Sequence, residues 1–279
     1  MAQADTDMLR DIPHILQDPL NFATASRNKN TIEMVSTAVR HKQTTLAYQP
    51  VMRANGGKTP AFYEGLIRVF DETGRIIPAA DFMDAVETTD TGRQIDCLAL
   101  EMGLQTLRDQ PNLRLSINMS ARSIGYPRWT ETLKQGLAHD PTVAERLILE
   151  ITESSAMMMP ELVTTFMASL QEKGIAFALD DFGAGYTAFR YLKEFYFDII
   201  KIDGQFIRGI AQDPDNQVLT RALLSIAEHF DMFSVAESVE SAEDAAFLAT
   251  MGVDCLQGYY YAAPTIHPPW DAKKAPKRA

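Results

Sequence analysis

Cysteine is scarce in this sequence, and its positions exclude one kind of site. Among 279 residues only Cys97 and Cys255 occur, and they form neither a CxxC pair nor any other metal-binding spacing. A zinc site built on paired cysteines is therefore excluded. The scarcity also fits a reducing cytoplasm, which is where we expect the protein to act.

Basic charge is also in deficit. Lysine and arginine total 26 residues against 37 aspartates and glutamates, which gives a formal net charge of -11. Sustained binding to a nucleic acid backbone requires the opposite sign, so we expect no polymeric nucleic acid partner. A small anionic ligand stays open, because bound cations can reverse the local field.

Long apolar runs are missing as well. No run approaches the length of a transmembrane helix, and the first residues, MAQADTDMLRD, are polar and acidic without the apolar region of a signal peptide. We therefore expect a soluble cytoplasmic protein with no membrane insertion.

The hydrophobic content of 46% is ample for a large core. We expect a weakly periodic N-terminal appendage or linker over residues 1–28, a main domain over residues 29–267, and a basic, disordered tail over residues 268–279. In the main domain, LAYQPVMRA and TPAFYEGLIRVF flank the turn at residues 55–58, a pattern typical of an antiparallel hairpin. Strands and helices then alternate, which indicates an α/β fold with a mostly parallel sheet. Seven or eight strands in one domain of this size favour a closed barrel.

Polar residues stand at or just after the ends of the strand-like runs. Such positions are costly for charged groups unless something pairs with them. Because they recur along the chain, we expect them to share one site at the mouth of a parallel barrel. The positions are Glu64, Asn118, Glu150, Asp180, Asp181, Lys201, Glu237 and Gln257.

Oxygen donors dominate this set, which suits hard divalent cations such as Mg²⁺ or Mn²⁺. None of the five histidines lies at these strand ends, so zinc is not expected. Five carboxylates in one pocket need counter-charge, which two cations and Lys201 would supply. Two neighbouring divalent ions are a known arrangement for hydrolysing phosphodiesters.

Taken singly, each of these residues has an ordinary structural reading, as a salt-bridge partner, a helix cap or a turn. Two local matches also carry little weight. Asp181-Phe182-Gly183 matches the kinase DFG motif, but no HRD loop or glycine-rich loop precedes it. The GxGxxA pattern that begins at Gly183 follows two aspartates, which would repel a pyrophosphate unless metals intervene.

Several longer motifs, in order, carry a resemblance that covers about residue 30 to Pro264. They are YQPV, YEGLIR, INMS, LEITES, LDDFGAGYTAFRYL, IIKIDGQFI, VAESVE and QGYYYAAP. On these motifs the chain resembles the EAL-domain family of cyclic di-GMP phosphodiesterases. The resemblance implies a modified (β/α)₈ TIM-type barrel whose first strand is antiparallel to the others. It also implies a homodimer and hydrolysis of cyclic di-GMP to linear pGpG by water activated by two metals.

The resemblance further implies roles for individual residues. The first metal would take Glu64, Asn118, Glu150 and Asp180, and the second would share Asp180 and add Asp181 and Glu237. Lys201 would position or deprotonate the attacking water, and Gln257 and Glu240 would orient water and the surrounding shell. Substrate contacts would come from Gln49, Leu66 and Arg68, with Arg68 at a phosphate. Glu153 and Thr187 would brace the loop at DFGAGY. Calcium is expected to inhibit.

The chain departs from the family pattern at several places. Gly65 replaces alanine beside Glu64, which we expect to loosen the ligand through backbone freedom. Ser238 replaces glycine beside Glu237 and would be strained if φ there is positive. Ala184 and Ala188 remove two hydroxyls from the DFGAGY loop. These departures keep an alternative open, a weakly active or inactive cyclic di-GMP receptor or scaffold that acts with a regulatory protein partner. A metal-dependent barrel enzyme acting on another substrate, such as an enolase-like acid, is a more distant alternative.

Overall fold

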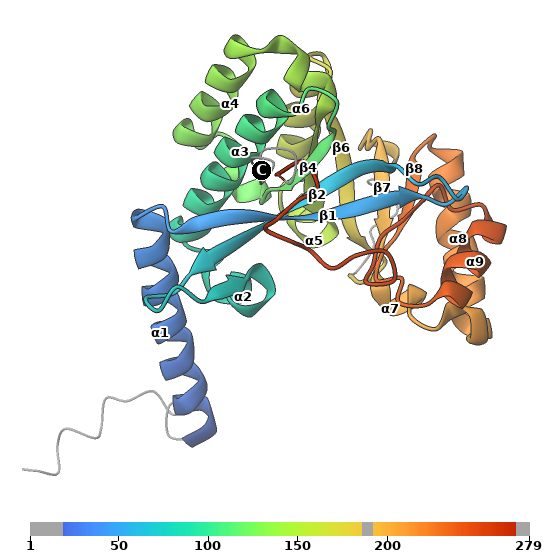
Figure 1. Ribbon diagram of the computed structural model, residues 1–279, viewed down its shortest axis with the longest axis horizontal. Coiled ribbons are helices and arrows are strands. Elements are labelled where there is room, and N and C mark those ends of the chain that lie inside the picture. Colours follow the sequence, from blue (N-terminus) through green and yellow to red (C-terminus); the bar gives the residue numbers. More distant parts are fainter. Residues whose placement is uncertain (1–18, 186–191, 272–279) are drawn as a thin grey trace, which may run out of the picture.

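The computed structural model describes the backbone of residues 19–185 and 192–271, and side chains from residue 29 onward. Eight strands close into a barrel, and a ninth short strand, β3, pairs with the carboxyl-terminal end of β2 (Figure 1). The strands are β1 (Thr44–Arg53), β2 (Pro60–Phe70), β3 (Ile76–Pro78), β4 (Leu115–Asn118), β5 (Leu147–Thr152), β6 (Ala176–Phe182), β7 (Ile199–Ile202), β8 (Phe233–Ala236) and β9 (Cys255–Leu256).

Strand direction confirms the predicted variant of the barrel. From β2 through β4 to β9, each barrel strand pairs in parallel with the next. β1 closes the ring and is antiparallel to both of its neighbours, β2 and β9. The expected hairpin around residues 55–58 is therefore the β1–β2 pair. The carboxyl ends of the parallel strands consequently meet at one mouth of the barrel.

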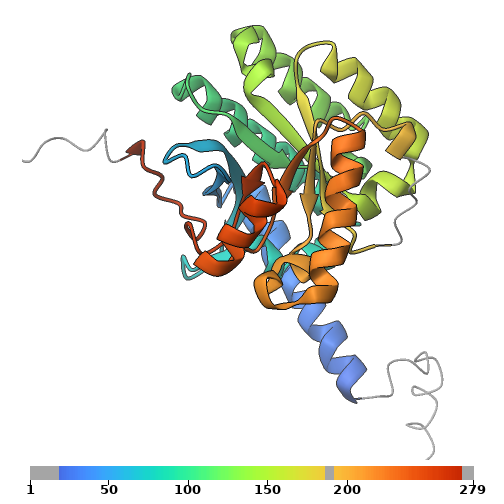
Figure 2. The same ribbon diagram turned by 90° about the vertical axis from the view of Figure 1, so that its right-hand side faces the viewer.

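Helices lie around the barrel, and the first of them projects beyond it (Figure 1). They are α1 (Pro19–Arg40), α2 (Met83–Val86), α3 (Asp90–Asp109), α4 (Pro127–His139), α5 (Glu153–Met158), α6 (Pro160–Gln171), α7 (Gly204–Ile207), α8 (Pro214–His229) and α9 (Ala242–Met251). Short 3₁₀ segments lie at Ala79–Asp81, Ala121–Ser123, Pro141–Arg146 and Ile210–Gln212. Figure 2 shows α8 and α9 in front of the strands. None of the helices in the described part of the chain is both long and apolar enough to cross a membrane.

Two features near the ends of the described chain bear on the expected boundaries. Helix α1 begins at Pro19 and runs through residue 28, so a division between an appendage and the barrel would fall inside a helix. Trp270 lies in the segment expected to be a disordered tail, yet its ring packs edge-on against Tyr48 of β1 and Tyr63 of β2. A large aromatic side chain gains free energy by such packing, which orders the backbone that carries it. Residues 1–18 and 272–279 lie outside the described part.

The interior of the barrel has an apolar floor. It is a cluster of buried side chains near the amino ends of the parallel strands, made of Val51, Phe62, Ile148, Ala178, Ile199, Val235 and Cys255. A second, larger cluster fills the space between the strands and the helices. The floor therefore lies between the amino end of the barrel and the polar groups above it.

Candidate active site

The apolar floor and the predicted polar residues are related by the pleat of the strands. Phe62, Ile148 and Ile199 each precede a predicted site residue by two positions, respectively Glu64, Glu150 and Lys201. The same spacing relates Ala178 to Asp180, Val235 to Glu237 and Cys255 to Gln257. Side chains two positions apart lie on the same face of a strand. The polar residues therefore also point into the barrel and form a layer directly above the apolar floor, on the side of the mouth.

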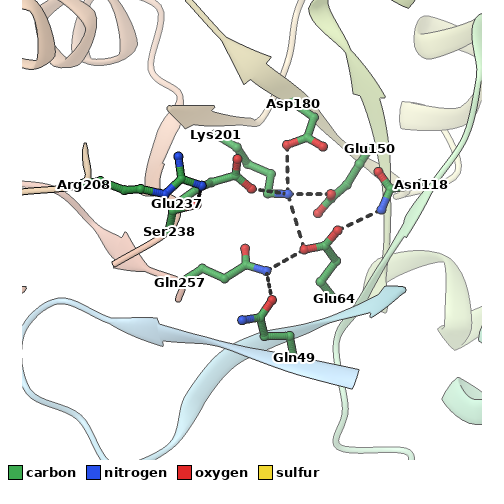
Figure 3. Close-up of polar contacts among 10 residues, drawn as sticks. All are labelled: Gln49, Glu64, Asn118, Glu150, Asp180, Lys201, Arg208, Glu237, Ser238 and Gln257. Atoms are coloured by element: carbon green, nitrogen blue, oxygen red, sulfur yellow. Dashed lines mark hydrogen bonds and ion pairs between the residues drawn. The ribbon is translucent and has the colours of Figure 1, made fainter. Parts of the chain in front are cut away.

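Lys201 of β7 lies at the centre of this layer (Figure 3). Its Nζ is 2.8 Å from Glu150 Oε2, 2.8 Å from Glu237 Oε1 and 2.9 Å from Asp180 Oδ1. Glu64 Oε2 is a fourth neighbour at 3.5 Å. The lysine is only 1% exposed, so one buried ammonium group is shared among four carboxylates. The expected convergence of the strand ends is therefore what the structure shows.

Amide side chains surround Glu64 on β2. Asn118 Nδ2 donates to Glu64 Oε1 at 2.8 Å, and Gln257 Nε2 donates to Glu64 Oε2 at 2.5 Å. Gln257 Nε2 also reaches Gln49 Oε1 at 3.1 Å, while Gln49 Nε2 donates to the carbonyl of Ala262 at 3.0 Å. This chain of hydrogen bonds fixes the orientation of the Glu64 carboxylate relative to three other strands.

Burial and mutual repulsion perturb the acidic groups. Burial, together with the negative charges of Asp180 and Glu64, raises the pKa of Glu237 to about 8, although the positive charge of Lys201 acts in the opposite direction. Burial and the neighbouring Glu64 raise the pKa of Glu150 well above its usual range. Burial and the adjacent Asp180 raise the pKa of Asp181 to about 6. One lysine therefore does not neutralise the whole cluster at neutral pH.

For Glu64 and Lys201, neighbouring groups outweigh the effect of burial on the pKa. Burial alone would raise the pKa of Glu64, but Lys201 and the two amides outweigh it and lower that pKa. Burial would lower the pKa of Lys201, but the surrounding carboxylates, Asp180 and Glu150 foremost, outweigh it and raise that pKa well above its ordinary value. The Lys201 ammonium is therefore stable in its buried position.

The donor set fits divalent cations. Carboxylate oxygens of Asp180, Asp181 and Glu237, the residues expected at the second metal, lie within 4.8 Å of one another. Glu150 Oε1 is buried and has no hydrogen-bond partner among the described residues. A buried, unpaired carboxylate oxygen is costly unless a proton or a cation occupies its lone pairs. The four residues expected at the first metal lie together. Lys201 contacts Glu64, Glu150 and Asp180, and Asn118 donates a hydrogen bond to Glu64.

A cavity of about 670 Å³ opens above the cluster, lined in part by Glu64, Asp180, Lys201, Glu237 and Gln257. The expected substrate contacts Gln49, Leu66 and Arg68 also line it, as does Glu240, which was expected to orient water. The sequence reasoning missed three lining side chains that could contact a ligand, Asp81, Arg208 and Tyr259. Asp81 ends the 3₁₀ segment after β3, and Arg208 and Tyr259 lie in turns beyond the strand ends, where the strand pattern gives no signal.

Of the two residues expected to brace the loop after β6, Glu153 contacts that loop. Glu153 Oε2 accepts a hydrogen bond from the backbone N–H of Gly183 at 3.0 Å, and Gly183 has a φ of +94°. Thr187, the other expected brace, lies in residues 186–191, outside the described part of the chain.

Gly65 and Ser238 behave differently from one another. A Cβ at Gly65 would lie 2.7 Å from Ile117 Cδ1, so the space that alanine would take is filled. Gly65 also pairs with Tyr48 on one side and with Ile117 on the other. The expected loosening beside Glu64 is therefore wrong, because both edges of the strand are held. Ser238 does have a positive φ, +54°, which confirms the condition for strain.

Comparisons with known proteins agree on one family. An EAL domain model matches residues 32–264. The chain is 30% identical over 268 residues to cyclic di-GMP phosphodiesterase PdeF of Escherichia coli K12, covering 95% of this chain and 35% of that protein. It is 32% identical over 232 residues to PdeR of the same organism, covering 81% of this chain and 35% of that protein. The chain thus spans about a third of the length of these curated relatives.

Solved structures show the same likeness. The PaMucR phosphodiesterase in complex with c-di-GMP superposes with a TM-score of 0.74 at 26% identity, covering 87% of this chain and 99% of that one. The FimX EAL domain from Pseudomonas aeruginosa bound to c-di-GMP gives 0.77 at 25% identity, covering 85% of this chain and 97% of that one. With a family model matched over most of its length and a barrel of the same architecture, the chain belongs to the EAL domain family.

Proposed function

We propose that the protein is a metal-dependent phosphodiesterase that hydrolyses cyclic di-GMP to linear pGpG and so lowers the level of this bacterial second messenger. The observation that carries the proposal is the buried layer of four carboxylates around Lys201 at the barrel mouth. It is supported by relatives that are themselves named cyclic di-GMP phosphodiesterases. Every ligand position that the family resemblance implies carries an oxygen donor in this chain.

The acidic layer would hold two divalent cations, Mg²⁺ or Mn²⁺. Glu64, Asn118, Glu150 and Asp180 are proposed for the first, and Asp180, Asp181 and Glu237 for the second. When bound, the cations supply charge neutralisation of the phosphate and lower the pKa of water. Binding would also replace the protons that Glu237 and Glu150 hold near neutral pH, so metal uptake is expected to release protons.

Lys201 supplies a positive charge that does not depend on metal. In the metal-free protein the surrounding carboxylates, Asp180 and Glu150 foremost, outweigh burial and raise the pKa of Lys201, so its ammonium can donate hydrogen bonds and orient water. This favours the positioning role over deprotonation of the water by a neutral lysine. Gln257 donates to Glu64 and is 4% exposed, so it orients that ligand from within the barrel.

The shape above the layer suits a two-lobed ligand. A second cavity of about 390 Å³ adjoins the main cavity and shares Glu64, Leu66, Asp180 and Asp181 with it. The acidic layer therefore lies where the two lobes meet. A dinucleotide with a phosphate over that junction could extend one nucleoside into each lobe, which places the reacting bond at the cations.

Three further expectations remain proposals. Calcium should compete for the same oxygens and inhibit, because its looser coordination suits binding more than reaction. A homodimer and a regulatory protein partner would use surfaces near the loop after β6. Both cysteines are free and buried, which is compatible with the expected cytoplasmic location.

The proposal is tested by a matched pair of variants. Glu150→Gln removes one buried carboxylate from the layer, whereas Glu172→Gln makes the same chemical change on the exposed end of α6. We expect Glu150→Gln to lose turnover of cyclic di-GMP and Glu172→Gln to retain it. Calorimetry of cyclic di-GMP binding accompanies the assay, because tight binding by an inactive wild-type protein would assign the receptor function instead.

A further inference from the structure

Ser238 is strained at a position next to a proposed metal ligand. It follows Glu237 directly and has a φ of +54°, in a region that favours glycine. A β-carbon in this conformation raises the energy of the backbone, and such residues persist only where surrounding contacts hold them. The contacts of the Ser238 hydroxyl therefore point to what it does.

The hydroxyl of Ser238 holds an arginine. Arg208 Nη2 donates to Ser238 Oγ at 3.0 Å, and Arg208 Nε lies 3.5 Å from Glu240 Oε1. Gly204 provides the space for this contact, since a methyl group there would overlap the Ser238 hydroxyl and lie 3.2 Å from Arg208 Cζ. The Arg208 side chain is still 57% exposed and lines the main cavity. Its Nη1 has no hydrogen-bond partner among the described residues.

The position of Arg208 across the barrel mouth is informative. Arg208 follows α7, which begins two residues after β7, and Arg68 lies on β2. In the closed ring β7 is four strands from β2 in either direction, so the two arginines lie on opposite sides of the mouth. Both line one cavity. The remaining cation there, Lys201, is buried among carboxylates, so Arg68 and Arg208 are the two guanidinium groups among the described lining residues.

Most other charged groups that line this cavity are acidic, namely Glu64, Asp81, Asp180, Asp181, Glu237 and Glu240. A cyclic dinucleotide carries two phosphates on opposite sides of its ring. Cations at the acidic layer would account for only part of that charge. A pair of guanidinium groups across the mouth supplies donors on both sides, in the planar geometry that phosphate oxygens accept.

We propose that Arg208, held by the Ser238 hydroxyl, contacts a phosphate of the substrate on the side of the mouth opposite Arg68. This inference rests on the proposed function and names two more residues for the same site. Arg208 is the substrate-binding residue, and Ser238 is a positioning residue that acts through it. Glu240, on this account, orients Arg208 from the other side of its guanidinium group.

The test compares five variants, one of them a control, by their KM and kcat and by their Kd for cyclic di-GMP in the presence of calcium. We expect Arg208→Ala to raise KM and Kd by about tenfold to a hundredfold, since a hydrogen bond between charged groups is lost, with kcat within about threefold of the wild type. Arg208→Lys should recover part of the affinity. Arg221→Ala, on the exposed face of α8, is the control and should change nothing.

The two Ser238 variants separate positioning from stability. Ser238→Ala and Ser238→Gly both remove the hydroxyl and should raise Kd in the same direction as Arg208→Ala. Only the glycine variant relieves the backbone, so we expect its Tm to rise by about 2 °C while its affinity falls. If the serine had only a structural role, a variant with a higher Tm would not bind cyclic di-GMP more weakly. The loss in Arg208→Ala should also shrink between about 50 mM and about 500 mM salt, because a contact between charges is screened.

The outcomes distinguish this inference from the proposed function. A wild-type protein that neither binds nor hydrolyses cyclic di-GMP removes the proposed function, and the inference with it. A wild-type protein that binds, with Arg208→Ala and Ser238→Ala binding equally well, overturns the inference alone. A loss that is the same at both salt concentrations overturns the assignment to a phosphate.

Discussion

Replacing Lys201 by methionine should destabilise the metal-free protein strongly. The ammonium is 1% exposed and lies within 3.5 Å of four carboxylates. Removing one partner from a buried ion pair costs about 3–5 kcal/mol, because the remaining charge has lost its counter-charge and cannot be solvated. We therefore expect the free energy of unfolding to fall by about 3–5 kcal/mol at pH 8 in the presence of a chelator.

The deficit should depend on pH and on metal. Burial already raises the pKa of Glu150 and of Glu237, and Lys201 opposes that rise, so without Lys201 the native state should hold more protons than the unfolded chain. The free energy of unfolding of the variant should then fall as the pH rises, and the deficit should be smaller at pH 5 than at pH 8. Mg²⁺ or Mn²⁺ should stabilise the variant more than the wild type, because the cations replace the missing charge.

Urea unfolding followed by circular dichroism measures these differences, at both pH values with chelator and with each cation. Lys173→Met makes the same substitution at an exposed position after α6 and is the control. A Lys201→Met protein within about 1 kcal/mol of the wild type at pH 8 in chelator would refute the reasoning, because it would show that the ammonium neutralises no buried charge.

Three other predictions follow from single residues. Glu64→Ala and Asp180→Ala should each abolish turnover of cyclic di-GMP while near-ultraviolet circular dichroism stays native, and wild-type rates in either variant would contradict the two-metal assignment. Burial raises the pKa of Asp96 to about 7, so the native state holds a proton that the unfolded state releases above about pH 4, and the free energy of unfolding should decline by about 3 kcal/mol as the pH rises from 4 to 7. Asp96→Asn should lack this part of the decline in urea unfolding at pH 5 and pH 8, and an identical decline would exclude Asp96 as its source. Gly65→Ala should lower the free energy of unfolding by about 1–3 kcal/mol through overlap with Ile117, and the added Ile117→Val should restore most of it; an unchanged midpoint in Gly65→Ala would show that Ile117 yields freely.

Much of this site could be predicted because the barrel has a simple periodicity. Ile148 and Glu150 are two residues apart on one strand, as are Ile199 and Lys201. The same short stretch of sequence therefore supplies one residue to the apolar floor and one to the polar layer at the mouth. The antiparallel first strand was also predictable, since the turn at residues 55–58 joins two strands directly. A parallel pair would have needed a crossover.

Other features depend on contacts between segments distant in sequence. Arg208 lies on a loop, and only the packing of Gly204 against Ser238 brings it to the cavity. Trp270 looked like part of a disordered tail because its neighbours are basic and proline-rich, whereas its partners Tyr48 and Tyr63 are two hundred positions away. The effect of Gly65 was misjudged for the same reason, because Ile117 fills the space beside it from another strand.

The central claim is that this barrel hydrolyses cyclic di-GMP with divalent cations, and product analysis tests it most directly. Purified protein is incubated at micromolar concentration with cyclic di-GMP and either Mg²⁺ or Mn²⁺, and the nucleotides are separated and quantified over time. We expect cyclic di-GMP to be converted to an equal amount of pGpG, with no conversion in chelator. A folded protein that yields no pGpG with either cation would contradict the claim.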